Sequence, residues 1–213
     1  MFDGVLFDLD GTLWDATGRI CEAWNVVLRR HPEISRPPVT VPEVRATMGL
    51  LLPDIARKIL PSEDEATRAV LLQEHEDVEC ALLCAQGGAL YPAVEETLSA
   101  LSARARLFVV SNCQDGYIQT FYAAHKLDRY FTGFECAGRT GQPKSHNIAL
   151  VARQYGLARP VYVGDTLLDC TSAREAGVPF LHAAYGFGSP IEGVPAVRAF
   201  ADIPAALAAM CPP

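Results

Sequence analysis

The sequence is poor in lysine: only three of its 213 residues are lysine, at positions 58, 126 and 144. Eighteen basic residues stand against twenty-five acidic ones, and the formal net charge is −7. A surface with this excess of negative charge does not attract nucleic acid or an anionic membrane, because both are themselves negative. We therefore expect neither as a partner, and an anion-binding site has to rest on a local concentration of positive charge.

The sequence also lacks the segments that direct a protein into or across a membrane. No apolar run approaches the ~20 residues that a membrane helix needs. Met1-Phe2-Asp3-Gly4 offers neither the basic start nor the apolar core of a signal peptide. Half of the residues are nevertheless apolar and a fifth are charged, which favours a packed core over a disordered chain. These features predict a globular protein of the cytoplasm.

The cysteines follow no regular spacing. They stand at positions 21, 80, 84, 113, 136, 170 and 211, and no CxxC pair occurs. Neither a disulfide framework nor a zinc site is therefore expected. Burial as small apolar side chains is the simpler interpretation, also for Cys113 and Cys170, which stand beside the polar residues considered below.

Short apolar runs that end in polar residues recur along the chain. The clearest strands are expected at 4–9, 107–111, 161–164 and 179–183, and weaker ones at 134–137 and 197–201. Helices are expected at 94–105, 116–125, 146–155, 169–176 and 204–210. This alternation indicates an α/β fold with a Rossmann-like parallel sheet covered on both faces. Such sheets bind ligands at the carboxyl ends of their strands.

Residues 15–86 interrupt the alternation, because they show helical patterns and no convincing strand. Helices are expected at 17–30, 41–48, 53–60 and 62–84, punctuated by prolines. Gly87-Gly88 offers a hinge where the chain returns. We expect an all-helical cap domain over residues 15–86, inserted into a core domain formed by residues 1–14 and 87–213.

Carboxylates follow two of the expected strands. Asp8 and Asp10 end the first strand and stand two residues apart, so they can face one site. Asp165 and Asp169 follow the strand at 161–164. Acids gathered at one sheet edge repel one another unless a proton or a cation intervenes. Their oxygens suit a hard cation, so the sequence predicts a Mg²⁺ site.

Two further segments offer phosphate ligands. Ser111 and Asn112 end the strand at 107–111, where a hydroxyl, an amide and backbone donors can hold a phosphate oxygen. Lys144 precedes the helix at 146–155 and can offset carboxylate repulsion while binding phosphate as a point charge. Taken singly, such residues can equally cap a helix or lie in solvent.

Together these residues resemble the motifs of the haloacid dehalogenase superfamily. The match comprises Asp8-Leu9-Asp10-Gly11-Thr12 for the first motif, Ser111 for the second, Lys144 for the third, and Gly164-Asp165 with Asp169 for the fourth. Order and spacing agree over essentially the whole chain. A helical cap between the first two motifs is similar to the phosphoglycolate-phosphatase-like subgroup. The third motif departs from the family, since Ser145 follows Lys144 where proline is common.

The resemblance implies a Mg²⁺-dependent phosphatase for a small phosphorylated metabolite, either a phosphoglycolate-like ester or a sugar phosphate. It implies that Asp8 is the nucleophile that becomes an aspartyl-phosphate, and that Asp10 acts as acid and then as base. It further implies that Mg²⁺ is held by the carboxylates of Asp8 and Asp165 and by the backbone carbonyl of Asp10.

The remaining motif residues have supporting roles in the resemblance. Ser111, Asn112 and Lys144 are implied to bind the phosphoryl oxygens. Thr12 is implied to orient the turn, and Asp169 to support the metal or orient Lys144.

The sequence fits other functions known on this fold to different degrees. A phosphosugar mutase of the β-phosphoglucomutase type shares the motifs but carries histidine where this chain has Ile20. Phosphonoacetaldehyde hydrolases and dehalogenases lack the second acid that Asp10 supplies. A nucleoside monophosphate phosphatase and a non-catalytic binding protein of the same fold stay open.

Substrate choice is expected to come from the cap. Arg45 is the first candidate for contact with a substrate carboxylate, against a surface ion pair as the alternative. Arg57, Lys58 and His75 are further candidates. The chain is expected to be a monomer or a homodimer.

Overall fold

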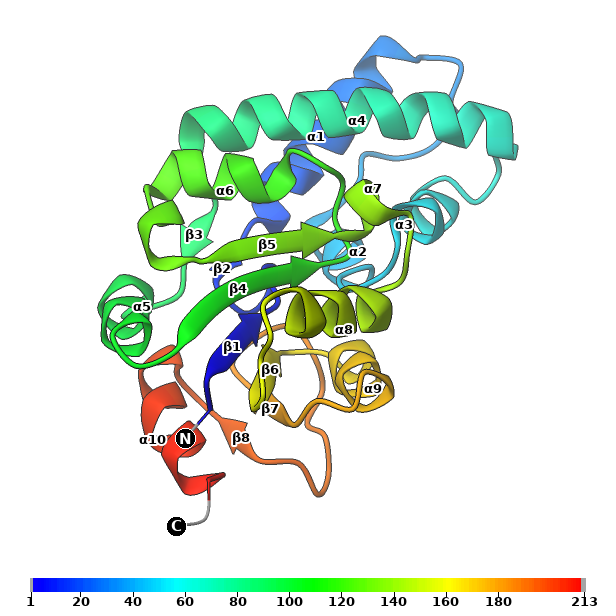
Figure 1. The fold of residues 1–213 in the computed structure, drawn as a ribbon. Helices are drawn as coiled ribbons and strands as arrows, with labels where there is room; N and C mark the ends of the chain where they lie inside the picture. Colours follow the sequence, from blue (N-terminus) through cyan, green and yellow to red (C-terminus); the bar gives the residue numbers. More distant parts are fainter. Residues whose placement is uncertain (1, 212–213) are drawn as a thin grey trace.

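The computed structural model describes residues 2–211 and contains a six-stranded sheet in the order β5-β4-β1-β6-β7-β8 (Figure 1). Every neighbouring pair of strands in this sheet is parallel. The strands are β1 (Gly4–Phe7), β4 (Arg106–Ser111), β5 (Gly133–Cys136), β6 (Pro160–Gly164), β7 (Phe180–Ala183) and β8 (Ala196–Val197). The parallel α/β fold predicted from the alternation of strands and helices is confirmed.

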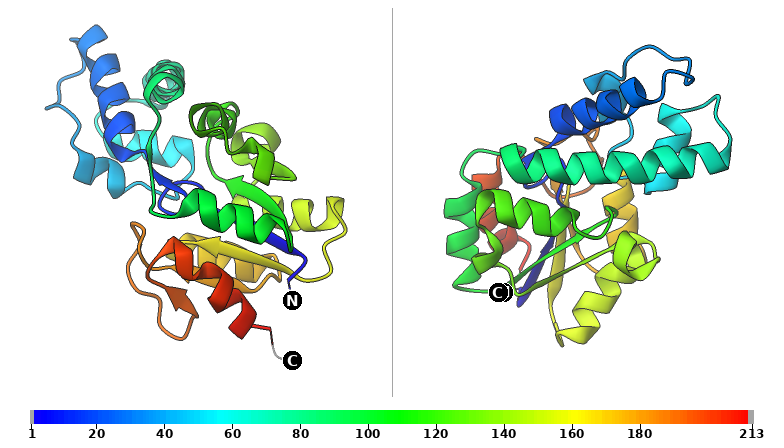
Figure 2. Two further views of the ribbon diagram at one scale, coloured as in Figure 1. Left: turned by 90° about the vertical axis from the view of Figure 1, so that its left-hand side faces the viewer. Right: turned by 90° about the horizontal axis from the view of Figure 1, so that it is seen from above.

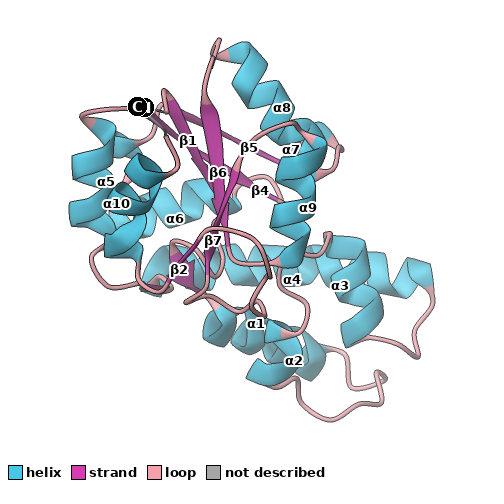
Figure 3. Ribbon diagram, turned by 90° about the horizontal axis from the view of Figure 1, so that it is seen from below, coloured by secondary structure: helices cyan, strands magenta, loops and turns pink. Residues whose placement is uncertain are grey.

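Helices cover both faces of the sheet. They are α5 (Val94–Ser102), α6 (Tyr117–His125), α7 (Ala137–Thr140), α8 (Lys144–Gln154), α9 (Leu167–Glu175) and α10 (Ile203–Ala209). Within β1, Val5 and Phe7 join the apolar cluster of α5, α6 and α10, whereas Leu6 joins that of α8 and α9. Alternate side chains of a strand point to opposite faces, so a strand buried on both faces is apolar throughout. Figure 3 shows the two groups of helices on opposite sides of the strands.

Four inserted helices lie over the ends of the strands. They are α1 (Thr17–Arg30), α2 (Val41–Arg45), α3 (Leu52–Ile59) and α4 (Glu65–Gln86). α4 is fixed at its start by Asp64, whose carboxylate accepts a hydrogen bond of 2.7 Å from the Thr67 amide. α4 packs against α1 on one side and against α6 of the sheet domain on the other (Figure 2). The helices therefore meet the end of the sheet at which polar residues gather.

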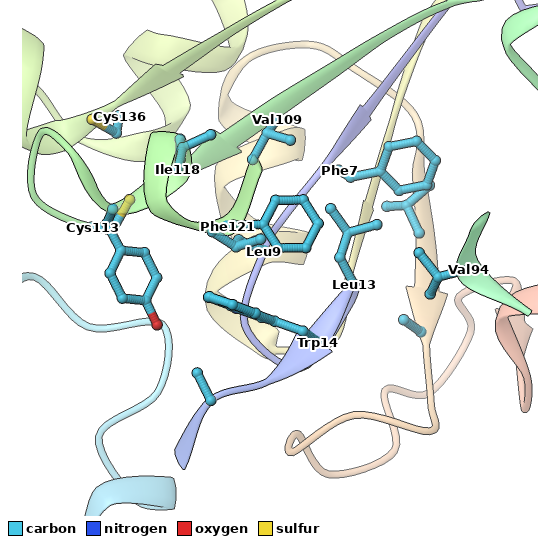
Figure 4. Close-up of a cluster of buried hydrophobic side chains, with 14 of the residues drawn as sticks. Phe7, Leu9, Leu13, Trp14, Val94, Val109, Cys113, Ile118, Phe121 and Cys136 are labelled. Carbon is cyan, nitrogen blue, oxygen red and sulfur yellow. The ribbon is translucent and has the colours of Figure 1, made fainter. Parts of the chain in front are cut away.

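The chain enters and leaves the inserted helices through a short ribbon. β2 (Trp14–Asp15) pairs antiparallel with β3 (Ala89–Leu90). The expectation of no strand within residues 15–86 is therefore wrong for Asp15, because two residues are too few to show an alternating pattern. Trp14 also anchors this ribbon, with its ring edge-on to Phe121 at a centroid distance of 5.0 Å (Figure 4). The division into domains at these residues stays a prediction.

The last expected strand is shorter than the sequence suggested. β8 ends at Val197, and a 3₁₀ turn covers Phe200–Asp202 just before α10. Phe200 is buried against Phe7, with ring centroids 5.8 Å apart. Its apolar character reflects this packing rather than a strand. A second 3₁₀ turn covers Asp128–Tyr130.

Among residues 2–211, no helix combines the length and the apolar character that crossing a membrane requires.

Candidate active site

The turn after β1 brings two acids to the centre of the sheet edge. The Asp8 amide donates to the Val163 carbonyl at 2.9 Å, which continues the pairing with β6 beyond the strand. The Leu9 carbonyl then accepts from the Leu13 amide at 2.8 Å, closing a tight turn. Gly11 has φ +80, and a Cβ there would lie 2.2 Å from Oδ2 of Asp165. Only glycine allows this turn to approach Asp165 so closely.

Lys144 bridges two buried carboxylates from different elements. Its Nζ lies 3.0 Å from Oδ1 of Asp8 and 2.6 Å from Oδ1 of Asp169. All three side chains are buried. Burial alone would lower the pKa of Lys144, but the charges of Asp169 and Asp8 outweigh it and raise that pKa. The lysine is therefore held as a cation at the base of the site, beside the carboxylates whose repulsion it was expected to offset.

Asp169 is fixed by the start of α9. Its Oδ2 accepts hydrogen bonds from the amide and the hydroxyl of Thr166, at 2.9 and 2.6 Å. The Asp169 amide donates back to Oγ1 of Thr166 at 3.2 Å, which completes a capping box. This leaves Oδ1 of Asp169 to hold Lys144 in place.

Asp165 joins the same cluster from the end of β6. Carboxylate oxygens of Asp8, Asp165 and Asp169 all lie within 4.8 Å of one another. Oδ2 of Asp165 accepts from the Phe187 amide at 2.7 Å, while its Oδ1 is buried and has no hydrogen-bond partner within the described residues. A Cβ on Gly186 would lie 2.3 Å from Cβ of Asp165, so the loop after β7 closes tightly over this carboxylate.

The electrostatics of this cluster fit a bound divalent cation. Burial, followed by the charge of Asp169, raises the pKa of Asp8 to about 6 although Lys144 opposes the shift. Burial and the charges of Asp169 and Asp8 raise the pKa of Asp165 to about 8. One lysine thus does not neutralise three buried acids. An oxygen-only donor set with an unsatisfied carboxylate oxygen suits Mg²⁺.

Asp10 occupies a different part of the site. Its Oδ1 accepts a hydrogen bond of 2.9 Å from the hydroxyl of Tyr117, in the first turn of α6. Desolvation within the site and the charge of Asp8 raise the pKa of Asp10 to about 7, and the hydrogen bond from Tyr117 opposes this shift. A carboxyl group poised near neutral pH can both give and take a proton.

The residues expected to bind phosphate flank the two acids. Ser111 is buried at the end of β4 and lines the same cavity as Asp8 and Asp10. The Asn112 side chain donates to the Gly49 carbonyl at 2.9 Å, so its amide group links the sheet domain to the inserted helices. Thr12 is fully buried, and its carbonyl accepts from the Tyr185 hydroxyl at 2.8 Å. Ser111 and Asn112 both line the cavity, and among residues 2–211 no hydrogen-bond partner is found for Oδ1 of Asn112.

A cavity of about 50 Å³ lies between these residues and the inserted helices. On the sheet side its wall is formed by Asp8, Asp10, Ser111, Asn112, Cys113, Gln114 and Tyr117. The inserted segment contributes Ile20, Trp24, Leu52, Ile55, Leu72, His75 and Glu79 from its helices, and Met48, Gly49 and Leu50 from the connection between α2 and α3. Glu79 is buried and accepts a hydrogen bond from the amide of Gln114. This contact joins α4 to the loop after β4.

The four cap residues expected to contact the substrate differ in their position relative to the cavity. His75 lines the cavity. Arg45 forms an ion pair with Asp15 at 2.9 Å, and its side chain is half exposed. Arg57 pairs with Asp54 and Glu65 on the outer surface, and Lys58 is also exposed. Neither Arg45, Arg57 nor Lys58 is part of the cavity wall.

Sequence reasoning missed Tyr117, Gln114 and Glu79. Tyr117 stands in the first turn of the helix that follows a site-bearing strand, which is a position that could have drawn attention. Glu79 lies within an even mixture of polar and apolar residues along α4, and no pattern distinguishes it. Cys113 reaches the cavity wall but is buried, and burial raises the pKa of its thiol.

Comparison with known proteins decides the family. A sequence profile described as haloacid dehalogenase-like hydrolase matches residues 5–183. This chain belongs to that family. The resemblance inferred from the motifs and the expectation of a hydrolase are thereby confirmed.

Two curated relatives of this hydrolase are similar along most of their length. A phosphoglycolate phosphatase of Caulobacter vibrioides is 32% identical over 225 residues, covering 98% of this chain and 93% of the relative. A plasmid-encoded phosphoglycolate phosphatase of Cupriavidus necator is 30% identical over 198 residues, covering 87% and 82% of the two chains. Both names describe phosphoric monoester hydrolases.

Solved structures share the fold of this hydrolase. A predicted phosphoglycolate phosphatase from Haemophilus somnus superposes with a TM-score of 0.84 at 22% identity, covering 96% of this chain and 97% of the other. CbbY from Rhodobacter sphaeroides, solved as a D10N mutant in complex with xylulose-1,5-bisphosphate, superposes with a TM-score of 0.81 at 18% identity, covering 95% and 96%. These similarities extend over the sheet and the inserted helices alike.

Proposed function

We propose that this hydrolase is a Mg²⁺-dependent phosphatase that cleaves a small phosphate monoester through an aspartyl-phosphate on Asp8. The observation that carries the proposal is the buried pairing of Asp8 with Lys144, beside the unsatisfied carboxylate of Asp165. A nucleophilic carboxylate, a fixed cation and a candidate metal ligand then meet at one point. The family and the names of the curated relatives support the same reaction.

Asp8 and Asp10 divide the chemistry between them. In the first step an oxygen of Asp8 attacks phosphorus, the bond to the leaving alcohol breaks, and Asp10 gives its proton to that alcohol. In the second step Asp10 takes a proton from water, whose oxygen attacks phosphorus and releases phosphate from Asp8. A carboxyl group whose pKa is raised to about 7 suits both roles near neutral pH.

The positive charge that a phosphate dianion requires comes from two sources. Lys144 faces Asp8, so it lies where it lowers the repulsion between the carboxylate and the incoming phosphoryl group. Asp8, Asp165 and the backbone carbonyl of Asp10 are the groups we expect to hold Mg²⁺. When bound, the ion would neutralise charge on the phosphoryl oxygens and on the clustered acids.

The neighbouring residues bind and orient. We expect Ser111 and the backbone of Asn112 to hold phosphoryl oxygens, and Thr12 to fix the turn that carries both acids. Asp169 positions Lys144. The inserted helices α1–α4 act as a cap that excludes water from the cavity. Ile20 is apolar and lines the cavity, so it supplies no proton carrier of the kind a mutase uses.

The proposal is tested by phosphate release. The purified chain, incubated with an aryl phosphate and Mg²⁺, is expected to release phosphate, and Asp8→Asn is expected to lower the rate by about a thousandfold or more. The matched control is Asp77→Asn, an equivalent change at an exposed position on α4. Activity of Asp8→Asn within tenfold of the wild type would remove Asp8 as the nucleophile.

A further inference from the structure

The part of the cavity that would receive the leaving alcohol carries no positive charge. Within residues 2–211, its wall contains no lysine or arginine. The inserted segment contributes mostly apolar side chains, among them Ile20, Trp24 and Leu72 from its helices and Met48 from the connection between α2 and α3. An anionic group beyond the scissile phosphate would therefore be buried without a partner, at a large cost in binding.

The lysine and arginine side chains within residues 15–86 either form ion pairs with acidic residues or are exposed to solvent. Arg45 pairs with Asp15, and Arg36 with Glu43. The others pair with acids on the outer surface, as Arg19, Arg57 and Arg68 do, or are exposed, as Arg29, Arg30 and Lys58 are. A carboxylate in the cavity would have to draw one of these side chains away from its present place.

Two polar residues that α4 contributes to the wall, Glu79 and His75, are unfavourable to an anion. Glu79 is 4% exposed and hydrogen-bonded to Gln114, and no cation of the described residues is among the groups that shift its pKa. Burial and the charges of Asp10 and Glu76, opposed by the hydrogen bond from Gln114, raise the pKa of Glu79 to about 8, which favours its neutral form near pH 7. It ionises if the pH rises, and it would then repel an anionic ligand.

His75 adds an unpaired acceptor. Its ring stacks on Trp24 at a centroid distance of 4.0 Å, and Nε2 lies 3.3 Å from the Ile20 carbonyl oxygen. A carbonyl oxygen only accepts, so Nε2 carries the proton and Nδ1 is left as a lone pair. Nδ1 is buried, and residues 2–211 offer it no hydrogen-bond partner. Burial lowers the pKa of His75 to about 4, so it offers no positive charge at neutral pH.

We infer that the substrate is the phosphate monoester of a small uncharged alcohol, and that a carboxylate or a second phosphate on the alcohol is disfavoured. The inference rests on the proposed phosphatase function and restricts the class of phosphate esters that the enzyme would hydrolyse. The curated relatives are named for the hydrolysis of phosphoglycolate, whose alcohol carries a carboxylate, so the inference predicts a different substrate for this chain.

Matched esters test the inference at pH 7 with Mg²⁺. Phosphoglycolate carries a carboxylate where 2-hydroxyethyl phosphate has a hydroxymethyl group, and the two esters are otherwise the same. 3-Phosphoglycerate and glycerol 3-phosphate form a second pair with the same difference. We expect kcat/KM to favour the uncharged member of each pair by about tenfold or more, since each 1.4 kcal/mol of unpaired burial is tenfold. Equal values, or a preference for the acids, would overturn the inference.

A variant with a new cation tests whether the lack of positive charge at the wall causes the preference for uncharged alcohols. Met48→Lys places an ammonium group at the apolar wall and is expected to shift the ratio toward phosphoglycolate by about tenfold. Met48→Gln has a similar length without the charge and should leave the ratio close to that of the wild type. Equal ratios in the two variants would show that charge at the wall does not control the choice.

Two outcomes separate this inference from the proposed function. If neither these esters nor an aryl phosphate releases phosphate, the phosphatase proposal itself fails. If phosphoglycolate is the better substrate and Arg45→Ala removes that preference, the phosphatase proposal holds and the inference fails, because Arg45 would then reach a substrate carboxylate. If a folded Met48→Lys variant cannot be obtained, the comparison of esters with the wild type still decides.

Discussion

The hydroxyl of Tyr117 donates a hydrogen bond of 2.9 Å to Oδ1 of Asp10. The two residues lie far apart in the sequence, and the contact forms because α6 begins where β4 delivers the chain to the site. Asp10 is thereby held in one orientation, with its second oxygen left for the reacting atoms. Tyr117 is a positioning residue for the proposed acid and base.

We expect Tyr117→Phe to lower kcat by about tenfold, because an acid that can rotate is aligned with the leaving oxygen for less of the time. KM should change less, since the phenylalanine keeps the apolar contact. Steady-state kinetics with an aryl phosphate measures both. Tyr122→Phe is the matched control, since the Tyr122 hydroxyl on the same helix is buried and finds no hydrogen-bond partner in the described part of the chain. A kcat for Tyr117→Phe equal to that of the control would contradict the positioning role.

Mg²⁺ is expected to stabilise the fold as well as to support activity. Binding at the acid cluster relieves repulsion in the native state only, so a saturating concentration should raise Tm by about 5 °C or more. Asp165→Asn removes an expected ligand and should reduce the rise, whereas Asp77→Asn should not. Differential scanning fluorimetry in chelator and in Mg²⁺ measures the effect without reference to catalysis. A Tm that does not respond to Mg²⁺, or activity that survives EDTA, would count against the metal site.

Removal of Lys144 should cost stability beyond its role in catalysis. Lys144→Met leaves Asp8 and Asp169 buried without their shared cation, and the expected loss is about 3 kcal/mol in the free energy of unfolding. Urea denaturation measures this loss. Lys58→Met makes the same change at an exposed position and should stay close to the wild type. If both variants unfold at the same urea concentration, the buried lysine does not hold the cluster together.

Glu79 should make stability fall as pH rises. Its ordinary pKa is 4.5 and burial raises it to about 8 in the folded chain. Between these values the unfolded chain has lost the proton and the folded chain has kept it. The stabilisation is therefore complete below pH 4.5 and is lost progressively up to pH 8, at a slope of at most about 1.4 kcal/mol per pH unit.

Glu79→Gln is the experiment for this pH dependence, because glutamine keeps the shape and does not titrate. Urea titrations at pH 5, 6, 7 and 8 in Mg²⁺ should show a shallower decline for the variant than for the wild type. Parallel declines would mean that Glu79 is already ionised in the folded chain, and the neutral cavity wall would then be in doubt.

The sequence carried the information for the sheet because its strands are buried on both faces. Gly4–Phe7 and Val161–Gly164 are apolar without interruption, and each is followed by acids, so both the strands and the site edge can be predicted. Lys144 could also be predicted, since a lysine is rare in this chain and stands at the start of a helix. The structure brings Asp8, Lys144, Asp165 and Asp169 together as the motif spacing suggested.

The sequence could not supply the contacts between segments distant along the chain. Glu79 meets Gln114, and Asn112 meets Gly49, only after the inserted helices have docked on the sheet. Arg45 looked suited to a carboxylate, but its pairing with Asp15 depends on where α2 lies relative to β2. Such placements follow from packing, which local patterns do not encode.

The ribbon of β2 and β3 has a consequence for how enzymes of this architecture can diverge. It holds the exit and the return of the chain side by side at Trp14 and Leu90, so the ends of the insertion are already joined whatever lies between them. Because the entropy of closing a loop grows only slowly with its length, about 0.6 kcal/mol for each doubling, the intervening segment can be lengthened, shortened or exchanged at little cost. A new substrate specificity can thus arise by exchange of the whole inserted segment, while the reacting residues at the edge of the sheet stay the same.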